Sequence, residues 1–106
     1  MDEQEYQRAA EACLERAARW LDGLEDVDVT KGDGIVTVEF EDGERFILNR
    51  QSAARQMWFA AGARAWHYRW DDAGGTWVDD RDGHDLYDRL AGVVGEKLGV
   101  RLSRPA

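Results

Sequence analysis

The sequence predicts an α+β fold in which two helices cover one face of an antiparallel sheet of about five to six strands. Apolar residues recur at helical spacing in the first 24 residues and again over 85–98. Between these stretches lie short segments in which apolar and polar residues alternate. Two helices with one-sided apolar stripes can cover the same sheet face, which gives a two-layer sandwich whose other sheet face is open to solvent. The length suits one domain over residues 1–106.

The first 24 residues contain an amphipathic helix, predicted over 3–24. Its apolar stripe recurs at spacings of three and four residues and consists of Tyr6, Ala10, Cys13, Leu14, Ala17, Leu21 and Leu24. The chain has one cysteine, so an internal disulfide is excluded. Because Cys13 lies on the stripe, we expect it to be a small core residue.

The middle of the chain has the alternation typical of strands. The predicted strands are 27–29, 35–40, 44–49, 56–60, 65–70 and 76–78. Asp42-Gly43 is a hairpin signal between the second and third of them.

A second helix is predicted over 85–98. Its apolar stripe is Leu86, Leu90, Val93, Val94 and Leu98. Either Asp82 or His84-Asp85 offers an N-terminal cap, and Gly99 offers a stop. Gly92 and Gly95 fall off the stripe, and each is expected to cost about 1 kcal/mol relative to alanine.

Strand alternation also predicts which side chains the open sheet face displays. Met57 and Phe59 are the core pair of their strand, so Trp58 points outward. A tryptophan among polar and basic side chains is a common signature of a protein contact. The alternative is an indole partly covered by long neighbouring side chains. The outward set is Thr37, Glu39, Arg45, Ile47, Asn49, Gln56, Trp58, His67 and Arg69.

Charge is distributed unevenly along a chain whose net charge is −8. Residues 1–44 carry fourteen acidic and four basic side chains, whereas residues 45–106 carry eight and ten. The excess of acid disfavours nucleic acids and anionic membranes as partners and favours cations and basic protein surfaces. The N-terminus is acidic, unlike a secretory signal or a transit peptide, and no apolar run has membrane-spanning length. We therefore expect a cytoplasmic protein.

The chain resembles the bacterial frataxin family in motifs spread over almost its whole length. These motifs are Leu48-Asn49-Arg50-Gln51, Gln56-Met57-Trp58-Phe59-Ala60, Trp66-His67-Tyr68, Trp77 and Asp80-Arg81-Asp82-Gly83 with Leu86 and Leu90 after them. The resemblance implies a two-layer α–β sandwich and a non-enzymatic role in iron–sulfur cluster assembly. In the family an acidic ridge binds ferrous and ferric iron weakly and meets a basic surface of the cysteine desulfurase.

The resemblance also implies the functional residues. The candidate iron ligands, which we call the acidic ridge, are Glu11, Glu15, Asp22, Glu25, Asp26 and Asp28. The candidate partner contacts are Asn49, Gln51, Gln56, Trp58, Asp22 and Asp26. Many relatives carry acids just before Leu21, where this chain has Ala-Arg-Trp at 18–20, so the ridge is thinner than is usual in the family.

The chemistry of such a ridge is that of oxygen ligands without a fixed cage. Carboxylates one helical turn apart, with side-chain roots about 5–6 Å from each other, can share a hydrated iron ion. We expect weak, promiscuous and salt-sensitive binding, and a monomer when no metal is bound. His67 and His84 are far from the ridge in sequence and are not expected to be ligands. Two alternatives stay open, which are ferroxidase or iron-storage activity at the ridge and an acidic interaction module without an iron role.

Overall fold

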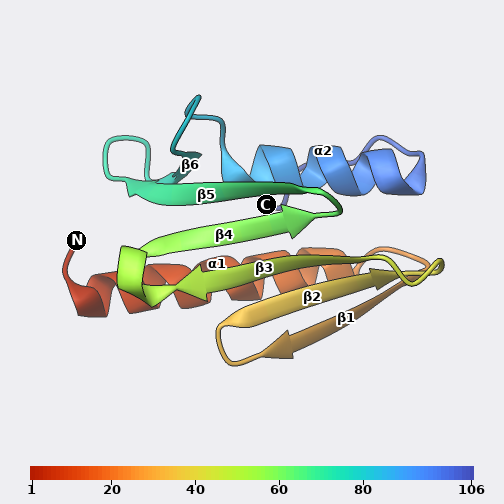
Figure 1. The fold of residues 1–106 in the computed structure, drawn as a ribbon, viewed down its shortest axis with the longest axis horizontal. Coiled ribbons are helices and arrows are strands. Elements are labelled where there is room, and N and C mark those ends of the chain that lie inside the picture. The colour runs from red at the N-terminus through yellow and green to blue at the C-terminus, as the bar shows by residue number, and fades with distance from the viewer.

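The computed structural model describes all 106 residues and has two helices and a six-stranded sheet (Figure 1). The predicted two-layer α+β sandwich is confirmed. The elements are α1 (Glu3–Asp22), β1 (Val27–Gly32), β2 (Ile35–Phe40), β3 (Arg45–Gln51), β4 (Gln56–Ala61), β5 (Arg64–Asp71), β6 (Thr76–Asp79) and α2 (Leu86–Leu98), with a 3₁₀ turn at Ser52–Ala54 that the sequence did not predict.

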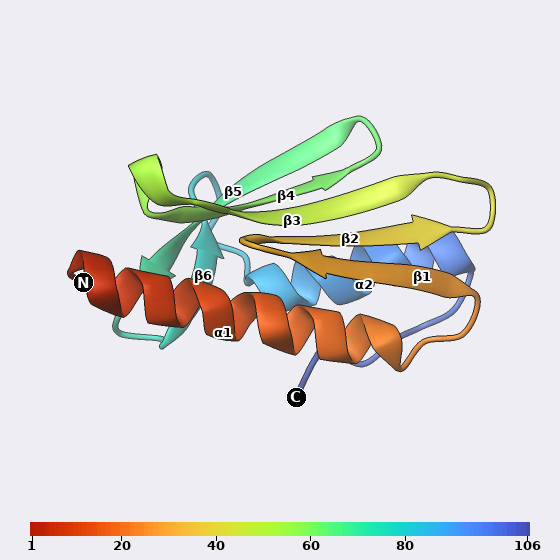
Figure 2. The same ribbon diagram turned by 90° about the horizontal axis from the view of Figure 1, so that it is seen from below.

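The six strands follow one another across the sheet in chain order, and every neighbouring pair is antiparallel. Figure 2 shows both helices on the same side of the sheet, with the other side uncovered. This arrangement fixes the alternation of each strand, because one set of side chains faces the helices and the other set faces solvent.

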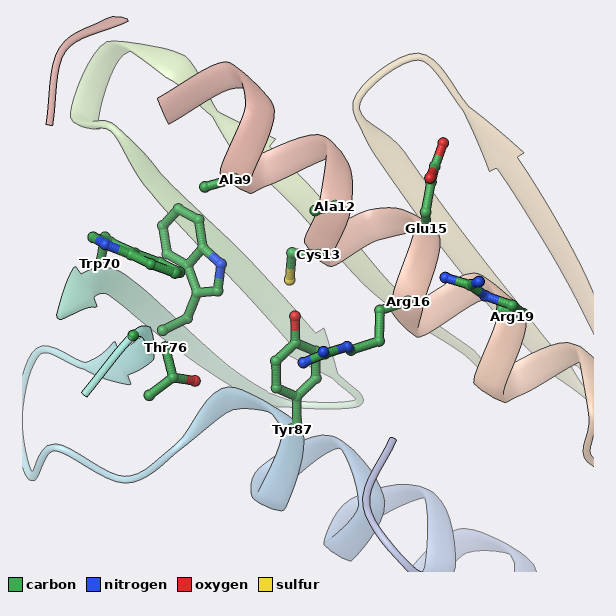
Figure 3. Close-up of a pocket in the computed structure, with 11 residues that line it drawn as sticks. Ala9, Ala12, Cys13, Glu15, Arg16, Arg19, Trp70, Thr76 and Tyr87 are labelled. Carbon is green, nitrogen blue, oxygen red and sulfur yellow. The ribbon is translucent and has the colours of Figure 1, made fainter. Parts of the chain in front are cut away.

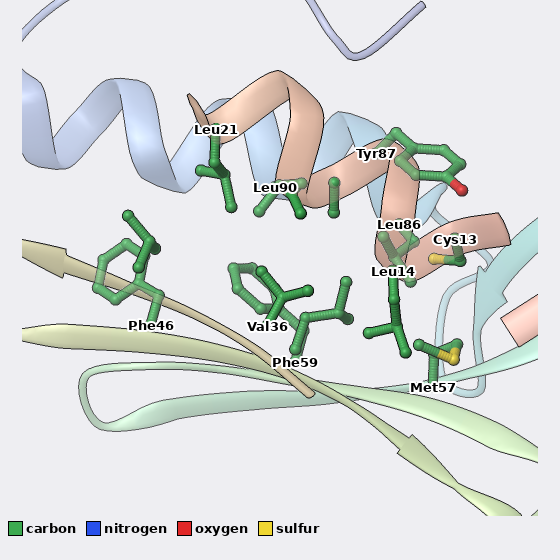
Figure 4. Close-up of a cluster of buried hydrophobic side chains, with 14 of the residues drawn as sticks. Cys13, Leu14, Leu21, Val36, Phe46, Met57, Phe59, Leu86, Tyr87 and Leu90 are labelled. Atoms are coloured by element: carbon green, nitrogen blue, oxygen red, sulfur yellow. The ribbon is translucent and has the colours of Figure 1, made fainter. Parts of the chain in front are cut away.

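The core lies between the helices and the sheet and contains 22 buried residues. Leu14 of α1 and Leu90 of α2 extend toward the sheet and Phe59 of β4 extends toward the helices, as Figure 4 shows. Cys13 is also buried, as its place on the apolar stripe predicts. Neither helix is both long enough and apolar enough to cross a membrane.

Both helices begin at aspartate caps. The carboxylate of Asp2 accepts the Glu5 backbone N–H while the Glu5 side chain accepts that of Asp2, a reciprocal capping box. Asp85 starts α2 by accepting the backbone N–H groups of Tyr87 and Asp88. The helix predicted over 3–24 ends two residues earlier than expected, at Asp22.

Gly95, which the sequence places off the apolar stripe of α2, is covered by the chain that follows this helix. Gly95 is buried, and a Cβ built on it would lie 2.6 Å from the backbone oxygen of Val100. The chain after α2 turns back at Gly99, which has a φ of +73°, and passes directly over Gly95. A Cβ built on Gly92, in contrast, would have no neighbouring atom within 4 Å.

Candidate functional site

The uncovered sheet face gathers all four partner contacts predicted on the strands. Asn49 of β3 pairs with Trp58 of β4, and Trp58 pairs with His67 of β5, so the three side chains form one row across three strands. Gln51 and Gln56 form the neighbouring row. The alternation inferred from the sequence therefore has the right phase, and no bulge reverses it.

Trp58 stands at the centre of this face, half-buried rather than fully exposed. Its indole is stacked on the His67 imidazole, with ring centroids 4.1 Å apart and planes 11° apart. Its Nε1–H donates to Gln56 Oε1 at 2.8 Å. One face of the indole is thus covered and its donor is occupied, so the free part of the ring offers an apolar contact in a fixed orientation.

Asp80, which follows β6, joins this network and was not predicted to do so. Its Oδ2 accepts from Gln56 Nε2 at 2.7 Å, and its Oδ1 lies 3.9 Å from Arg69 Nε. Strand alternation placed Gln56 and Arg69 on the open face but could not place Asp80, a residue of the motif at 80–83, because Asp80 follows β6 in a loop. We call Asn49, Gln56, Trp58, His67, Arg69 and Asp80 the tryptophan patch.

The helical part of the acidic ridge lies beside the edge strand β1. Glu11 Oε1 accepts from Lys31 Nζ of β1 at 2.8 Å, and Glu15 lies one turn further along α1. The hydrogen bond from Lys31 to Glu11 raises the pKa of Lys31, and the charges of Glu15 and Asp33 add to this effect. One of the six predicted ligands is therefore already neutralised by a lysine of the same chain.

The remaining ridge residues lie at and beyond the end of α1. Asp22 is the last residue of the helix, and Glu25 and Asp26 lie in the connection to β1. Asp26 has a φ of +64°, a left-handed conformation that aspartate tolerates better than most residues. Asp28 points to the open sheet face, because it pairs with Glu39 in the outward row of β2. All four are exposed.

The six ridge carboxylates do not converge on one point. No three of them have oxygens within 4.8 Å of one another, so the ridge offers scattered single ligands to a hydrated cation rather than a chelating site. The one close group of candidate ligand atoms is Asp79, Asp82 and His84, at the turn before α2. These ligand atoms already form hydrogen bonds that hold the turn. Asp79 Oδ2 accepts two backbone N–H groups, and both ring nitrogens of His84 are hydrogen-bonded.

A cavity of about 330 Å³ opens on the helical side of the molecule, between α1, β6 and the start of α2 (Figure 3). Cys13 lies at its base next to the Tyr87 hydroxyl, and Arg16 extends over the Tyr87 ring with its guanidinium carbon 5.0 Å from the centroid. Burial raises the pKa of the Cys13 thiol to about 12. The thiol is therefore protonated at neutral pH and is no nucleophile.

Comparison with known proteins agrees with this architecture. The profile of the frataxin-like domain matches residues 1–100, which include both helices and the whole sheet. A protein of Azotobacter vinelandii named iron–sulfur cluster assembly protein CyaY is 41% identical over 80 residues, which cover 76% of this chain and 73% of that protein. A protein of the same name from Cupriavidus taiwanensis is 38% identical over 93 residues, which cover 88% and 80%.

The fold is likewise that of a solved bacterial structure. Frataxin from Psychromonas ingrahamii matches with a TM-score of 0.86 and 26% identity, and the match covers 97% of each chain. The sequence match, the order of the elements and the motifs on the open sheet face lead to the same assignment, and the chain belongs to the frataxin-like family.

Proposed function

We propose that this chain is an iron-binding regulator or adaptor of iron–sulfur cluster assembly that docks on the cysteine desulfurase. Docking uses the acidic ridge and the tryptophan patch together. The observation that carries the proposal is the row Asn49, Trp58 and His67 on a sheet face that no helix covers. The names of its curated relatives support the assembly role. The protein acts as a monomer in the bacterial cytoplasm when no metal is bound.

The uneven charge of the chain determines which of its surfaces meets a basic partner. Residues 1–44 have a net charge of −10, and the exposed acids around Asp22, Asp26 and Asp28 lie at the edge next to β1. A basic partner surface relieves the repulsion among these carboxylates and speeds the encounter. The tryptophan patch then supplies the apolar contact that a purely electrostatic complex lacks. Binding should therefore weaken with salt but keep a salt-independent component from Trp58.

Iron in this proposal is held loosely by single carboxylates and water. The exposed acids at the end of α1, Asp22 and Glu25, have no lysine or arginine partner in the structure, whereas Glu11 is paired with Lys31. We therefore assign the stronger share of iron binding to the end of α1 and its connection to β1.

The docking experiment measures the affinity of the purified chain for a bacterial cysteine desulfurase by biolayer interferometry at low and high salt. We expect Trp58→Ala to reduce the affinity about tenfold or more at both salt concentrations. Val100→Ala is the matched control, because Val100 is an exposed apolar residue in the chain after α2, outside the sheet, and it should leave the affinity unchanged. If the desulfurase does not bind even at low salt, the proposed docking is wrong.

The iron experiment separates loose binding from a ferroxidase centre. Ferrous iron is titrated under argon, and its oxidation in air is then followed for the wild type, for Glu15→Ala with Asp22→Ala, and for Glu96→Ala as a control acid on α2. We expect the double variant to bind iron more weakly and all three proteins to show similar oxidation rates. An oxidation rate that falls only in the double variant would instead establish a ferroxidase site at the ridge.

A further inference from the structure

A buried tyrosine is hydrogen-bonded to a histidine that is itself held by an aspartate. Tyr68 of β5 is fully buried, and its hydroxyl oxygen lies 2.7 Å from His84 Nε2. On the other side of the imidazole, His84 Nδ1 lies 2.6 Å from Asp82 Oδ1. The three side chains form a relay that runs from the core to the turn before α2.

The hydrogen bonds fix where the protons of this relay lie. Asp82 accepts the backbone N–H and the ring N–H of His84, and both bonds hold the pKa of Asp82 below its usual value. Asp82 is therefore a carboxylate at neutral pH, and Nδ1 of a neutral His84 must carry the ring proton. Nε2 then has a free lone pair, so the Tyr68 hydroxyl donates to it.

This geometry prepares Tyr68 for loss of one electron. A phenol becomes far easier to oxidise if its proton leaves together with the electron. Burial raises the pKa of Tyr68, so the phenol does not ionise into solvent on its own. His84 Nε2 is already at proton-transfer distance, and the imidazolium that forms is stabilised by the Asp82 carboxylate on its far side.

The other two tyrosines lack such a base. The Tyr6 hydroxyl donates to the backbone carbonyl of Gln56 at 2.8 Å, and an amide oxygen does not accept a proton at neutral pH. Tyr87 lies against the protonated thiol of Cys13 and under the cationic side chain of Arg16. Tyr6 and Tyr87 are therefore internal controls for the effect of the His84 imidazole on the oxidation of Tyr68.

Trp66 provides a route for the electron to the surface. It is half-buried and lies two residues before Tyr68 on the same face of β5, with its ring edge-on to His84 at a centroid distance of 6.5 Å. The electron can leave through this indole while the proton stays inside the relay. A bulky oxidant need not touch the buried phenol.

We propose that Tyr68 is a redox-active tyrosine that gives one electron, by way of Trp66, to one-electron oxidants at the protein surface. The oxidant is reduced by one electron, the Tyr68 O–H bond breaks, and its proton forms a new N–H bond at His84 Nε2. The products are a neutral tyrosyl radical and an imidazolium paired with Asp82. A one-electron reductant such as ascorbate returns the electron, and the proton moves back to the phenol oxygen. Oxidation is thereby confined to one residue that can be restored.

The test is photo-oxidation of the intact chain by tris-bipyridyl ruthenium(III), generated with a laser flash and persulfate. Transient absorption and freeze-quench electron paramagnetic resonance identify the radical. We expect a tyrosyl radical in the wild type, with slower formation in D₂O. Tyr68→Phe should abolish it, and His84→Asn should slow its formation about tenfold or more while a tryptophan radical accumulates. Tyr6→Phe and Tyr87→Phe should leave the signal unchanged.

A measurement on the unmodified chain keeps the proposal testable even if a variant fails to fold. High-field resonance of the wild-type radical should show an exchangeable proton hydrogen-bonded to the phenoxyl oxygen, which the imidazolium supplies. Three results would each overturn the proposal. The first is a radical without that proton, and the second is a wild-type radical on Tyr6, Tyr87 or a tryptophan. The third is a folded Tyr68→Phe protein with an undiminished tyrosyl signal. Iron is absent from this test, so its outcome is independent of the proposed assembly function.

Discussion

The indole of Trp58 lies flat on the imidazole of His67, and the two residues are direct cross-strand partners on β4 and β5. The stack holds the indole at one angle to the sheet before any partner arrives. A side chain that is already ordered loses less rotational freedom on binding, so a contact made by Trp58 costs less than one made by a freely rotating ring. His67 is exposed, so this ordering role is separable from the stability of the core.

Replacing His67 by alanine should weaken docking without unfolding the chain. We expect His67→Ala to reduce the affinity for the cysteine desulfurase about three- to tenfold, the share that an aromatic pair contributes. Biolayer interferometry measures the affinity, and circular dichroism checks the fold. Ala65→Ser is the control on the same strand and the same face. An affinity that rises in His67→Ala would mean that the imidazole merely shields the indole.

The two glycines of α2 should respond in opposite directions to alanine. Gly92→Ala should raise the free energy of unfolding by about 1 kcal/mol, because alanine is the better helix former and its Cβ meets nothing. Gly95→Ala should lower it by about 1–3 kcal/mol, because the new Cβ collides with the Val100 backbone. Urea unfolding of the two variants measures both changes. Equal effects would show that the tail leaves Gly95 in solution.

Cys13 should make the chain less stable in moderately alkaline solution. Burial raises its pKa from 9.0 to about 12. Above pH 9 the unfolded chain releases this proton while the folded chain keeps it, so the stabilisation present below pH 9 is lost as the pH rises towards 12. The slope should reach about 1.4 kcal/mol per pH unit.

This slope is best measured between pH 9 and pH 10. The tyrosines and lysines with raised pKa values have usual values of 10.0 and 10.5, so they contribute mainly above this range. Urea unfolding of Cys13→Ala should show a flatter dependence on pH over the same interval, whatever its stability at pH 7. A wild-type stability that does not change from pH 8 to pH 10 would contradict the buried thiol.

The C-terminal tail should contribute to stability through contacts with both helices. The indole N–H of Trp20 donates to the Ser103 carbonyl, and Arg104 lies 3.1 Å from Asp85 and 3.0 Å from Asp88. We expect removal of residues 103–106 to lower the free energy of unfolding by about 1–3 kcal/mol. Arg101→Ala, a change in an exposed residue without an ion pair, should have little effect. A truncated chain as stable as the full one would show that these contacts are weak in solution.

The sequence by itself determined the layers and the faces of the fold. Helical and strand periodicities are local properties, so the stripe of α1 and the outward position of Trp58 could be read from neighbouring residues. The predicted ends differ from the observed ones by at most three residues, because a strand or helix continues for as long as its partner allows. The roles of the ridge and of the tryptophan patch remain predictions that binding experiments must test.

The tertiary structure alone decided which side chains from distant elements meet. Asp80 joins Gln56, His84 reaches Tyr68, and the chain after Gly99 crosses Gly95 only because turns and tail are placed by the packed core. It also showed that the ridge acids stay apart and that one of them is paired with Lys31. Such contacts depend on loop paths and on distances across the sheet, and no periodicity in the sequence encodes them.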